Sequence, residues 1–291
     1  MKRRIVTAVL ASFILAGLSV SARDASAQEI QLTGPLKGAP AVRHLRLYRQ
    51  GRLEIAPAAS FTLLDEYRRT ILLGGTLTYN ITDWLGIGVW GAAGVIGTET
   101  NLASQIDTNA PRNPLTATNV NHTTNPDGTL GNAPFKNQLA QISYVIAPQA
   151  TFVPFRGKLA IFNKIFVDTD FYVSGGVGFV GLKERGDCGG LSPQLSCADP
   201  ASFALTSTTK IAPTFGVGLK FYPTGSFWSL GVEYRALPFA WNRAGFDTRG
   251  SGPNGNFPDE KINGDDETFR FNQLVTIALG FYLPTAPKLS E

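Results

Sequence analysis

Large apolar residues alternate with small or polar residues along most of the chain beyond residue 50. From Thr268 to Leu283, the odd positions carry Phe, Val, Ile or Leu and the even positions are mostly small or polar, with Gln273 and Leu274 out of phase. A two-residue period places successive side chains on opposite faces of a β-strand. Eight segments of ten or more residues share this period, which predicts an all-β fold of eight long strands.

Eight such strands could form a soluble sandwich, a lipocalin-like cup or a barrel whose apolar face meets lipid. Here the face rich in Phe, Ile, Leu and Val carries almost no charge, and the charged residues share the face rich in Gly, Ala, Ser and Thr. The charges expected inside the barrel are those of Glu54, Asp170, Lys210, Lys220, Glu233, Arg235 and Arg270. Bulky apolar residues outside and small polar residues inside are typical of membrane barrels. The sequence therefore predicts an eight-stranded antiparallel transmembrane outer-membrane β-barrel.

The connections between strands favour the same fold. Outer-membrane barrels have short turns on the inner side and longer loops on the outer side. The expected inner connections are 81–84, 154–165 and 223–226, and the expected outer connections are 64–69, 98–137, 183–206 and 242–267. Three of the four outer connections are long, and two of the three inner ones are tight.

Aromatic residues gather beside the inner turns, where membrane barrels carry an interfacial girdle. The expected girdle residues are Tyr79, Trp84, Phe152, Tyr222, Trp228 and Tyr282. Only 16% of the residues are charged and 31 of the 291 are glycine, a composition that disfavours an ordinary soluble enzyme.

The first 27 residues have the form of a secretory signal: a basic start, an apolar run, and the small residues Ala25, Ser26 and Ala27 before the cleavage site. The apolar run is short for a membrane anchor, which is the alternative. We expect a periplasmic arm at 28–51, the barrel at 52–283 and a periplasmic tail at 284–291, in the outer membrane of a Gram-negative envelope. Cleavage of the leader would remove four basic residues and one acidic residue, which leaves the exported chain nearly neutral. Nucleic acid is therefore not expected as a partner.

Two cysteines, Cys188 and Cys197, are expected to form a disulfide in an outer loop, because export places them in an oxidising compartment. The inward charges allow two interpretations: they line a narrow aqueous pore, or they pair and fill the interior. We favour ion pairs, because an eight-stranded barrel is just wide enough to be filled by its own side chains. Asp170 and Lys220 are the expected pair.

No motif predicts an enzyme, a cofactor or a metal site. The GxGxxG matches at 86–91 and 176–181 lie inside predicted strands, whereas a dinucleotide site needs a helix after the motif. His44 and His122, the only histidines, have no identifiable catalytic partner. The acidic residues of 259–267 are interpreted as a solvated charge run, with Ca²⁺ binding as the alternative.

Three stretches, at 41–57, 77–86 and 157–164, resemble the outer-membrane β-barrel domain family of myxobacteria and related deltaproteobacteria. The resemblance implies a small barrel without catalytic residues, and some relatives serve in envelope-spanning assemblies such as gliding-motility machinery. We therefore expect a structural or interaction component of the envelope. It would contact outer-membrane lipid and lipopolysaccharide, and other envelope proteins through its arm or outer loops. A narrow or gated channel is the alternative, and a lipid- or peptide-hydrolysing barrel enzyme is a more distant one.

Overall fold

The computed structural model describes eleven parts of the chain, all within one compact unit, His44–Glu291. These parts are residues 46–111, 122–124, 127, 130–132, 134–161, 165–185, 205–223, 227–252, 254–259, 261–286 and 288–289.

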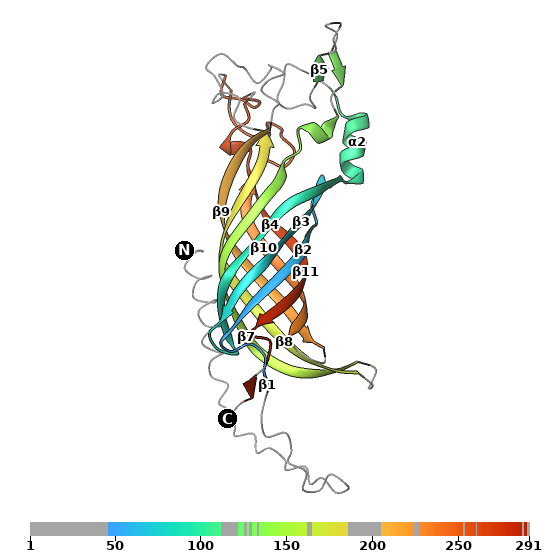
Figure 1. Cartoon of the computed structure of the whole chain (residues 1–291). Helices are drawn as coiled ribbons and strands as arrows, with labels where there is room; N and C mark the ends of the chain where they lie inside the picture. The colour runs from blue at the N-terminus through green and yellow to red at the C-terminus, as the bar shows by residue number, and fades with distance from the viewer. Residues whose placement is uncertain are drawn as a thin grey trace, which may run out of the picture. The chain divides into compact units, whose positions relative to one another are not determined.

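Eight long antiparallel strands close into a barrel in the order β10-β11-β2-β3-β4-β7-β8-β9 (Figure 1). They are β2 (Arg52–Leu63), β3 (Arg68–Asn80), β4 (Leu85–Glu99), β7 (Gln141–Ile161), β8 (Ile165–Arg185), β9 (Leu205–Tyr222), β10 (Trp228–Trp241) and β11 (Thr268–Leu283). Pairing of β11 with β2 and of β9 with β10 completes the circle, so every barrel strand has a paired neighbour on each side. The predicted closed eight-stranded antiparallel barrel is confirmed.

The remaining elements are short. They are β1 (Arg46–Leu47) paired with β12 (Lys288–Leu289), β5 (His122–Thr124) paired with β6 (Leu130–Asn132), α2 (Asn101–Asn109), η1 (Phe135–Asn137) and η3 (Gly264–Asp266). Within the described parts of the chain, no helix has both the length and the apolar character needed to cross a membrane.

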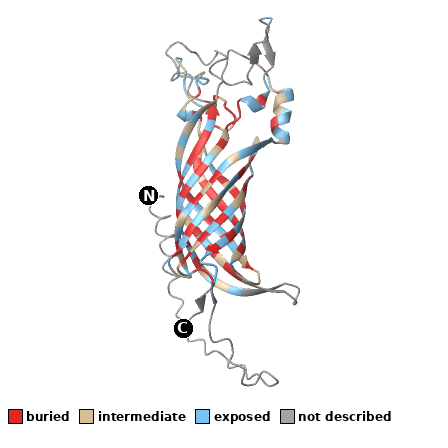
Figure 2. Ribbon diagram, in the orientation of Figure 1, coloured by how far each residue is buried: buried red, intermediate tan, exposed pale blue. Residues whose placement is uncertain are grey.

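Buried and exposed residues alternate along the strands, which gives the wall the chequered appearance of Figure 2. On β9, Val217 is 43% exposed on the outer face of the wall, whereas Thr214 is fully buried on the inner face. The predicted assignment of faces is therefore correct for this strand.

Two features of the wall differ from the expectation. The predicted connection at 154–165 is wrong, because β7 and β8 stay paired as far as Ile161 and Ile165 and form a long hairpin. The second feature is a set of three register shifts, one between Ile71 and Leu72 of β3 and two in β7, between Ile142 and Tyr144 and between Phe152 and Phe155. A bulge changes which face the following residues occupy, so simple alternation fails beyond it.

One end of the barrel holds the β3–β4 turn, the start of β2 at Arg52 and the end of β11 at Leu283, and we call it the base. We call the opposite end the rim. At the rim, α2 and η1 pack on the loop after β10. The apolar contact consists of Ala103, Phe135, Leu139 and Ala244, with Tyr67 and Phe246 against it. This packing joins two outer connections that are more than 100 residues apart in the sequence.

Candidate functional site

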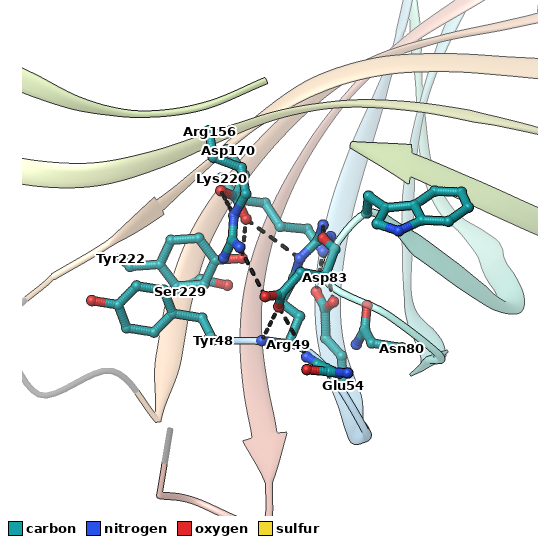
Figure 3. A network of polar contacts seen from close by, with 12 residues as sticks. Tyr48, Arg49, Glu54, Asn80, Asp83, Arg156, Asp170, Lys220, Tyr222 and Ser229 are labelled. Carbon is teal, nitrogen blue, oxygen red and sulfur yellow. Dashed lines mark hydrogen bonds and ion pairs between the residues drawn. The ribbon is translucent and has the colours of Figure 1, made fainter. Parts of the chain in front are cut away.

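Charged and polar side chains meet inside the barrel, beginning with a network at the base. This base network comprises Tyr48, Arg49, Asp83, Arg156, Asp170 and Tyr222 (Figure 3). The arm reaches it through a tight turn in which Gly51 has φ +66°, a conformation that favours glycine. The Gly51 amide donates to the Asn80 carbonyl at 2.7 Å, which ties the arm to the end of β3.

Asp170 of β8 lies at the centre of the base network. Its carboxylate pairs with Arg49 Nε at 3.4 Å and Arg156 Nε at 3.2 Å, and accepts a hydrogen bond from the Tyr222 hydroxyl at 2.9 Å. Arg156 also pairs with Asp83 of the β3–β4 turn at 2.9 Å. Two arginines and two aspartates thus neutralise one another, and Arg49 from the arm is only 1% exposed.

Aromatic rings complete the base. Tyr48 stacks on Tyr222 with ring centroids 4.8 Å apart, and its hydroxyl donates to Asp168 at 2.5 Å. The Tyr222 and Tyr282 rings lie 5.9 Å apart, with the Arg52 guanidinium 5.0 Å from the centre of the Tyr282 ring. Arg52 also donates to the carbonyls of Pro284 and Thr285. The arm and the segment after β11 therefore close the base together.

These positions correct the predicted aromatic girdle. Tyr222 and Tyr282 are 3% and 1% exposed and lie inside the barrel, because they share the inward phase of their strands with Lys220 and Gly280. The exposed girdle candidates at the base are Tyr79, Trp84 and Phe152, and Trp228 is half-buried. Trp84 and Phe152 meet edge to face at 5.9 Å.

A second layer of charges lies further into the barrel. Lys220 of β9 bonds both carboxylate oxygens of Glu54 on β2, at 2.5 and 2.6 Å. Nearby, Glu233 pairs with Arg235 at 2.6 Å, and the Arg235 guanidinium lies 4.3 Å from the centre of the Trp90 ring. Arg235 also donates to the Thr214 hydroxyl at 3.1 Å.

The predicted ion pair between Asp170 and Lys220 is wrong. The two residues are direct neighbours in the β8–β9 register, but Lys220 crosses the interior to Glu54. Asp170 is bound by the two arginines of the base network instead. The sequence pattern could not reveal this exchange of ion-pair partners, because Arg49 comes from the arm and not from a strand.

Two of the seven predicted interior charges do not fill the interior. Arg270 is 43% exposed and pairs with Glu66 at 3.3 Å, and Lys210 pairs with Glu267 while remaining partly exposed. In both pairs the acidic partner belongs to a rim connection. This end of the strands extends beyond the packed interior, so the Lys210 and Arg270 side chains stay partly exposed although they have the inward phase. Glu54, Asp170, Lys220, Glu233 and Arg235 are buried as predicted.

The third layer, toward the rim, is apolar. We call it the apolar layer, and its members include Leu72, Trp90, Ile142, Val145, Val180, Leu182, Leu237, Phe239, Trp241 and Leu274. The sequence signal for such a layer is a large apolar residue in the polar phase, as at Leu274, which breaks the alternation of its strand. Between this layer and the base lies a cavity of about 30 Å³, lined by Glu54, Thr76, Gln149, Tyr172 and Lys220 among others. That space is sufficient for about one or two water molecules.

One acidic residue of the last outer connection, Asp266, departs from the predicted solvated run, whereas Asp265 is exposed and Asp259 is partly exposed. Asp266 is buried and accepts hydrogen bonds from the backbone amides of Thr248, Arg249 and Asn263 at 2.7 to 3.1 Å. Among the described residues, no group of three or more His, Cys, Asp or Glu side chains is arranged to hold a metal ion.

Asp65 in the short β2–β3 connection pairs with Arg243 of the last outer connection at 3.7 Å. Burial raises the pKa of the Asp65 carboxyl above its ordinary value, although a hydrogen bond with Thr62 and the charge of Arg243 act in the opposite direction. Burial likewise lowers the pKa of the Arg243 guanidinium.

Both GxGxxG matches lie within strands, β4 and β8, as predicted. Gly176 is required there by close backbone approach, because a Cβ would collide with the Pro148 carbonyl of β7. Cys188, Cys197 and His44 lie outside the described residues, and for His122 only the backbone is described.

No protein-family model matches the chain, and no curated protein sequence matches it significantly. Among solved structures, the N-terminal β-barrel domain of Pseudomonas aeruginosa OprF is similar at 11% identity and TM-score 0.38, over 80% of this chain and 98% of that one. OprG from Pseudomonas aeruginosa matches at 11% identity and TM-score 0.36, over 81% and 97%. Ail, the attachment invasion locus protein of Yersinia pestis, matches at 13% identity and TM-score 0.30, over 80% and 98%. The barrel assignment rests on the closed strand pairing of this chain itself.

Proposed function

We propose that this protein is an outer-membrane barrel with a closed interior, acting as a structural or interaction component of the cell envelope. The outer face of the wall supports the membrane location. Large apolar side chains project outward from every strand of the barrel; examples are Ile55, Leu77, Ile87, Ile146, Phe179, Val217, Val232 and Ile277. A wall of this kind is stable in lipid and would aggregate in water.

The single observation that carries a structural role, in preference to transport, is the filling of the interior by successive layers. The base network, the two central ion pairs and the apolar layer occupy the described interior, with a cavity of about 30 Å³ between the base and the apolar layer. An ion crossing this interior would have to displace buried ion pairs and then pass a layer of Leu, Val, Phe and Trp side chains, where it would lose its hydration.

The arm is the proposed attachment point for another envelope protein. Arg49 and Tyr48 fix its end to β8, and β1 pairs with β12, so a load applied to the arm would reach the wall through ion pairs and backbone bonds. This arrangement suits a protein held in an envelope-spanning assembly, which is the role implied by the resemblance to the myxobacterial barrel family.

Conductance in planar lipid bilayers tests the closed interior. Purified protein should insert without producing reproducible current steps, while a large water-filled porin in the same bilayers provides the positive control. Stable steps from this protein would favour the narrow or gated channel. Crosslinking in native envelopes tests the attachment role: capture of a partner by a probe at the arm is expected, and repeated capture of nothing by arm and loop probes would contradict it.

A further inference from the structure

The barrel wall is interrupted near the rim between two neighbouring strands. β4 and β7 pair from Leu85 opposite Phe152 to Ala93 opposite Tyr144, and their pairing stops there. Both strands continue: β4 stays paired with β3 as far as Glu99, and β7 begins three residues earlier, at Gln141, paired with β8. A bulge lies on each side of the interruption, at Val95 and Ser143, and bulges bend strands apart.

A cavity of about 260 Å³ occupies this interruption. Its lining mixes the two faces of the wall. Arg68 and Thr70 lie on the inward phase of β3 with buried Leu72, whereas Lys183 lies on the outward phase of β8 with exposed Phe179. One cavity can reach both faces only where the strand pairing is absent. We call it the wall window.

The wall window is bounded above and below. Above it, β4 runs directly into α2 (Figure 1), and the Phe135 amide of η1 donates to Asp107 of α2 at 2.7 Å. Below it, Leu72, Ile142 and Leu182 of the apolar layer close the interior. The window is therefore a side pocket that does not continue through the barrel.

The charges in the wall window are positive and unpaired. Neither Arg68 nor Lys183 forms an ion pair within the described parts of the chain. The Ser143 hydroxyl is buried in the window without a hydrogen-bond partner among the described residues. Glu99 is opposite Arg68 in the β3–β4 register, but it is exposed and not part of the lining. The window thus offers two cationic groups and a free hydroxyl to an anion.

The outer margin of the window is apolar. Val95 and Ile96 line it and are each 53% exposed, on the wall whose outer face carries exposed apolar side chains such as Ile146 and Phe179. A ligand that fills the window must therefore combine an anionic group with an apolar part, and a volume of this size suits a headgroup. Arginine and lysine both bind phosphate oxygens, arginine through two parallel hydrogen bonds and lysine as a point charge.

We propose that the wall window binds the phosphate headgroup of a membrane amphiphile, held between Arg68 and Lys183 with its acyl chains along Val95 and Ile96. The inference rests on the proposed membrane location. It assigns the protein a specific lipid contact near the rim.

Binding of short-chain lipids to the full chain in neutral detergent tests the proposal. The probes are phosphatidic acid, the diacylglycerol with the same chains, and inorganic phosphate. Wild-type protein should bind phosphatidic acid at least tenfold more tightly than diacylglycerol, and inorganic phosphate should compete poorly. The double variant Arg68→Gln, Lys183→Gln should lose most of this preference. Arg69→Gln, which removes an exposed charge one residue away on the opposite face, should keep it.

A second variant fills the window without changing its charge. Gly97 faces the Arg68 guanidinium, so Gly97→Leu should displace that side chain and weaken phosphatidic acid binding severalfold. Gly175→Leu is the matched control, because a Cβ at Gly175 meets no atom within 4 Å. Equal preference in wild type and double variant would overturn the proposal, as would inorganic phosphate competing as well as the lipid.

Failure of the window and failure of the proposed function are separable. A closed barrel in detergent migrates faster on a gel before heating than after it, and this readout does not depend on lipid binding. Wild-type protein that migrates normally but does not prefer phosphatidic acid over diacylglycerol would overturn the lipid site in the wall window and leave the barrel fold intact. Current steps in bilayers would overturn the closed interior alone.

Discussion

Lys220 illustrates at the residue scale how a buried charge selects its partner. Its ammonium bonds both oxygens of Glu54 across the interior, although Asp170 is its neighbour in the sheet. We expect Glu54→Gln and Lys220→Met each to destabilise the barrel by about 3 kcal/mol, because each leaves one buried charge alone. The double variant should be about 1 to 3 kcal/mol less destabilised than the sum of the two single variants. Denaturant unfolding in lipid measures this coupling, and a stronger coupling of Lys220 with Asp170 would contradict the assignment.

Asp65 gives a pH-dependent prediction at the same scale. Its pKa is raised by burial, so the folded state holds its proton more tightly than the unfolded chain does. The free energy of unfolding should therefore fall as the pH rises from the ordinary Asp value to the raised value. Asp65→Asn should remove this decrease in the free energy of unfolding with pH, whereas Asp265→Asn, at an exposed position, should retain it. Unfolding curves at a series of pH values provide the measurement, and identical slopes in wild type and Asp65→Asn would count against the burial effect.

At the scale of elements, the arm and the segment after β11 close the base as a pair. Arg49 pairs with Asp170 and donates a hydrogen bond to the Asp83 carbonyl, and β1 pairs with β12. Arg49→Gln should weaken this closure by about 1.5 to 3 kcal/mol, the usual contribution of a hydrogen bond to a charged group. Amide exchange at 46–52 and 284–289 should then accelerate about tenfold or more, with little change in the central strands. Gln50→Ala, at an exposed position, is the control, and unchanged exchange in Arg49→Gln would show that the arm is held by other contacts.

The sequence predicts the strands well because alternation is a local property. The inward phase correctly places Glu233, Arg235 and Thr214 inside the barrel. It also places Tyr222 and Tyr282 inside, so the expectation that these two aromatics near turns belong to the girdle is wrong. The partner of Lys220 could not be predicted in this way, because it depends on which side chains meet across the interior. The wall window depends on where the pairing of β4 and β7 stops, which two bulges determine.

At the scale of the whole molecule, the apolar wall requires lipid contact. Val217→Arg should impair insertion into vesicles by about 2 to 4 kcal/mol, because it places a charge against the hydrocarbon. Val217→Leu should insert normally. Thr214→Arg, on the inner face, should also impair folding, since Thr214 is fully buried and bonded to Arg235. Gel migration after folding into vesicles reports insertion, and unimpaired insertion of Val217→Arg would argue that this face does not meet lipid.

The central claim is that the bulky face of the strands meets lipid and the other face encloses a packed interior. The four tryptophans test it directly, because Trp84 is 52% exposed in the β3–β4 turn, edge to face with exposed Phe152, whereas Trp90 is 1% exposed inside. Variants that retain a single tryptophan, the others replaced by Phe, can be folded into vesicles containing brominated lipid, which quenches tryptophan fluorescence on contact. The Trp84 variant should be strongly quenched and the Trp90 variant should keep most of its fluorescence. Strong quenching of Trp90 with protection of Trp84 would contradict the assignment of the two faces.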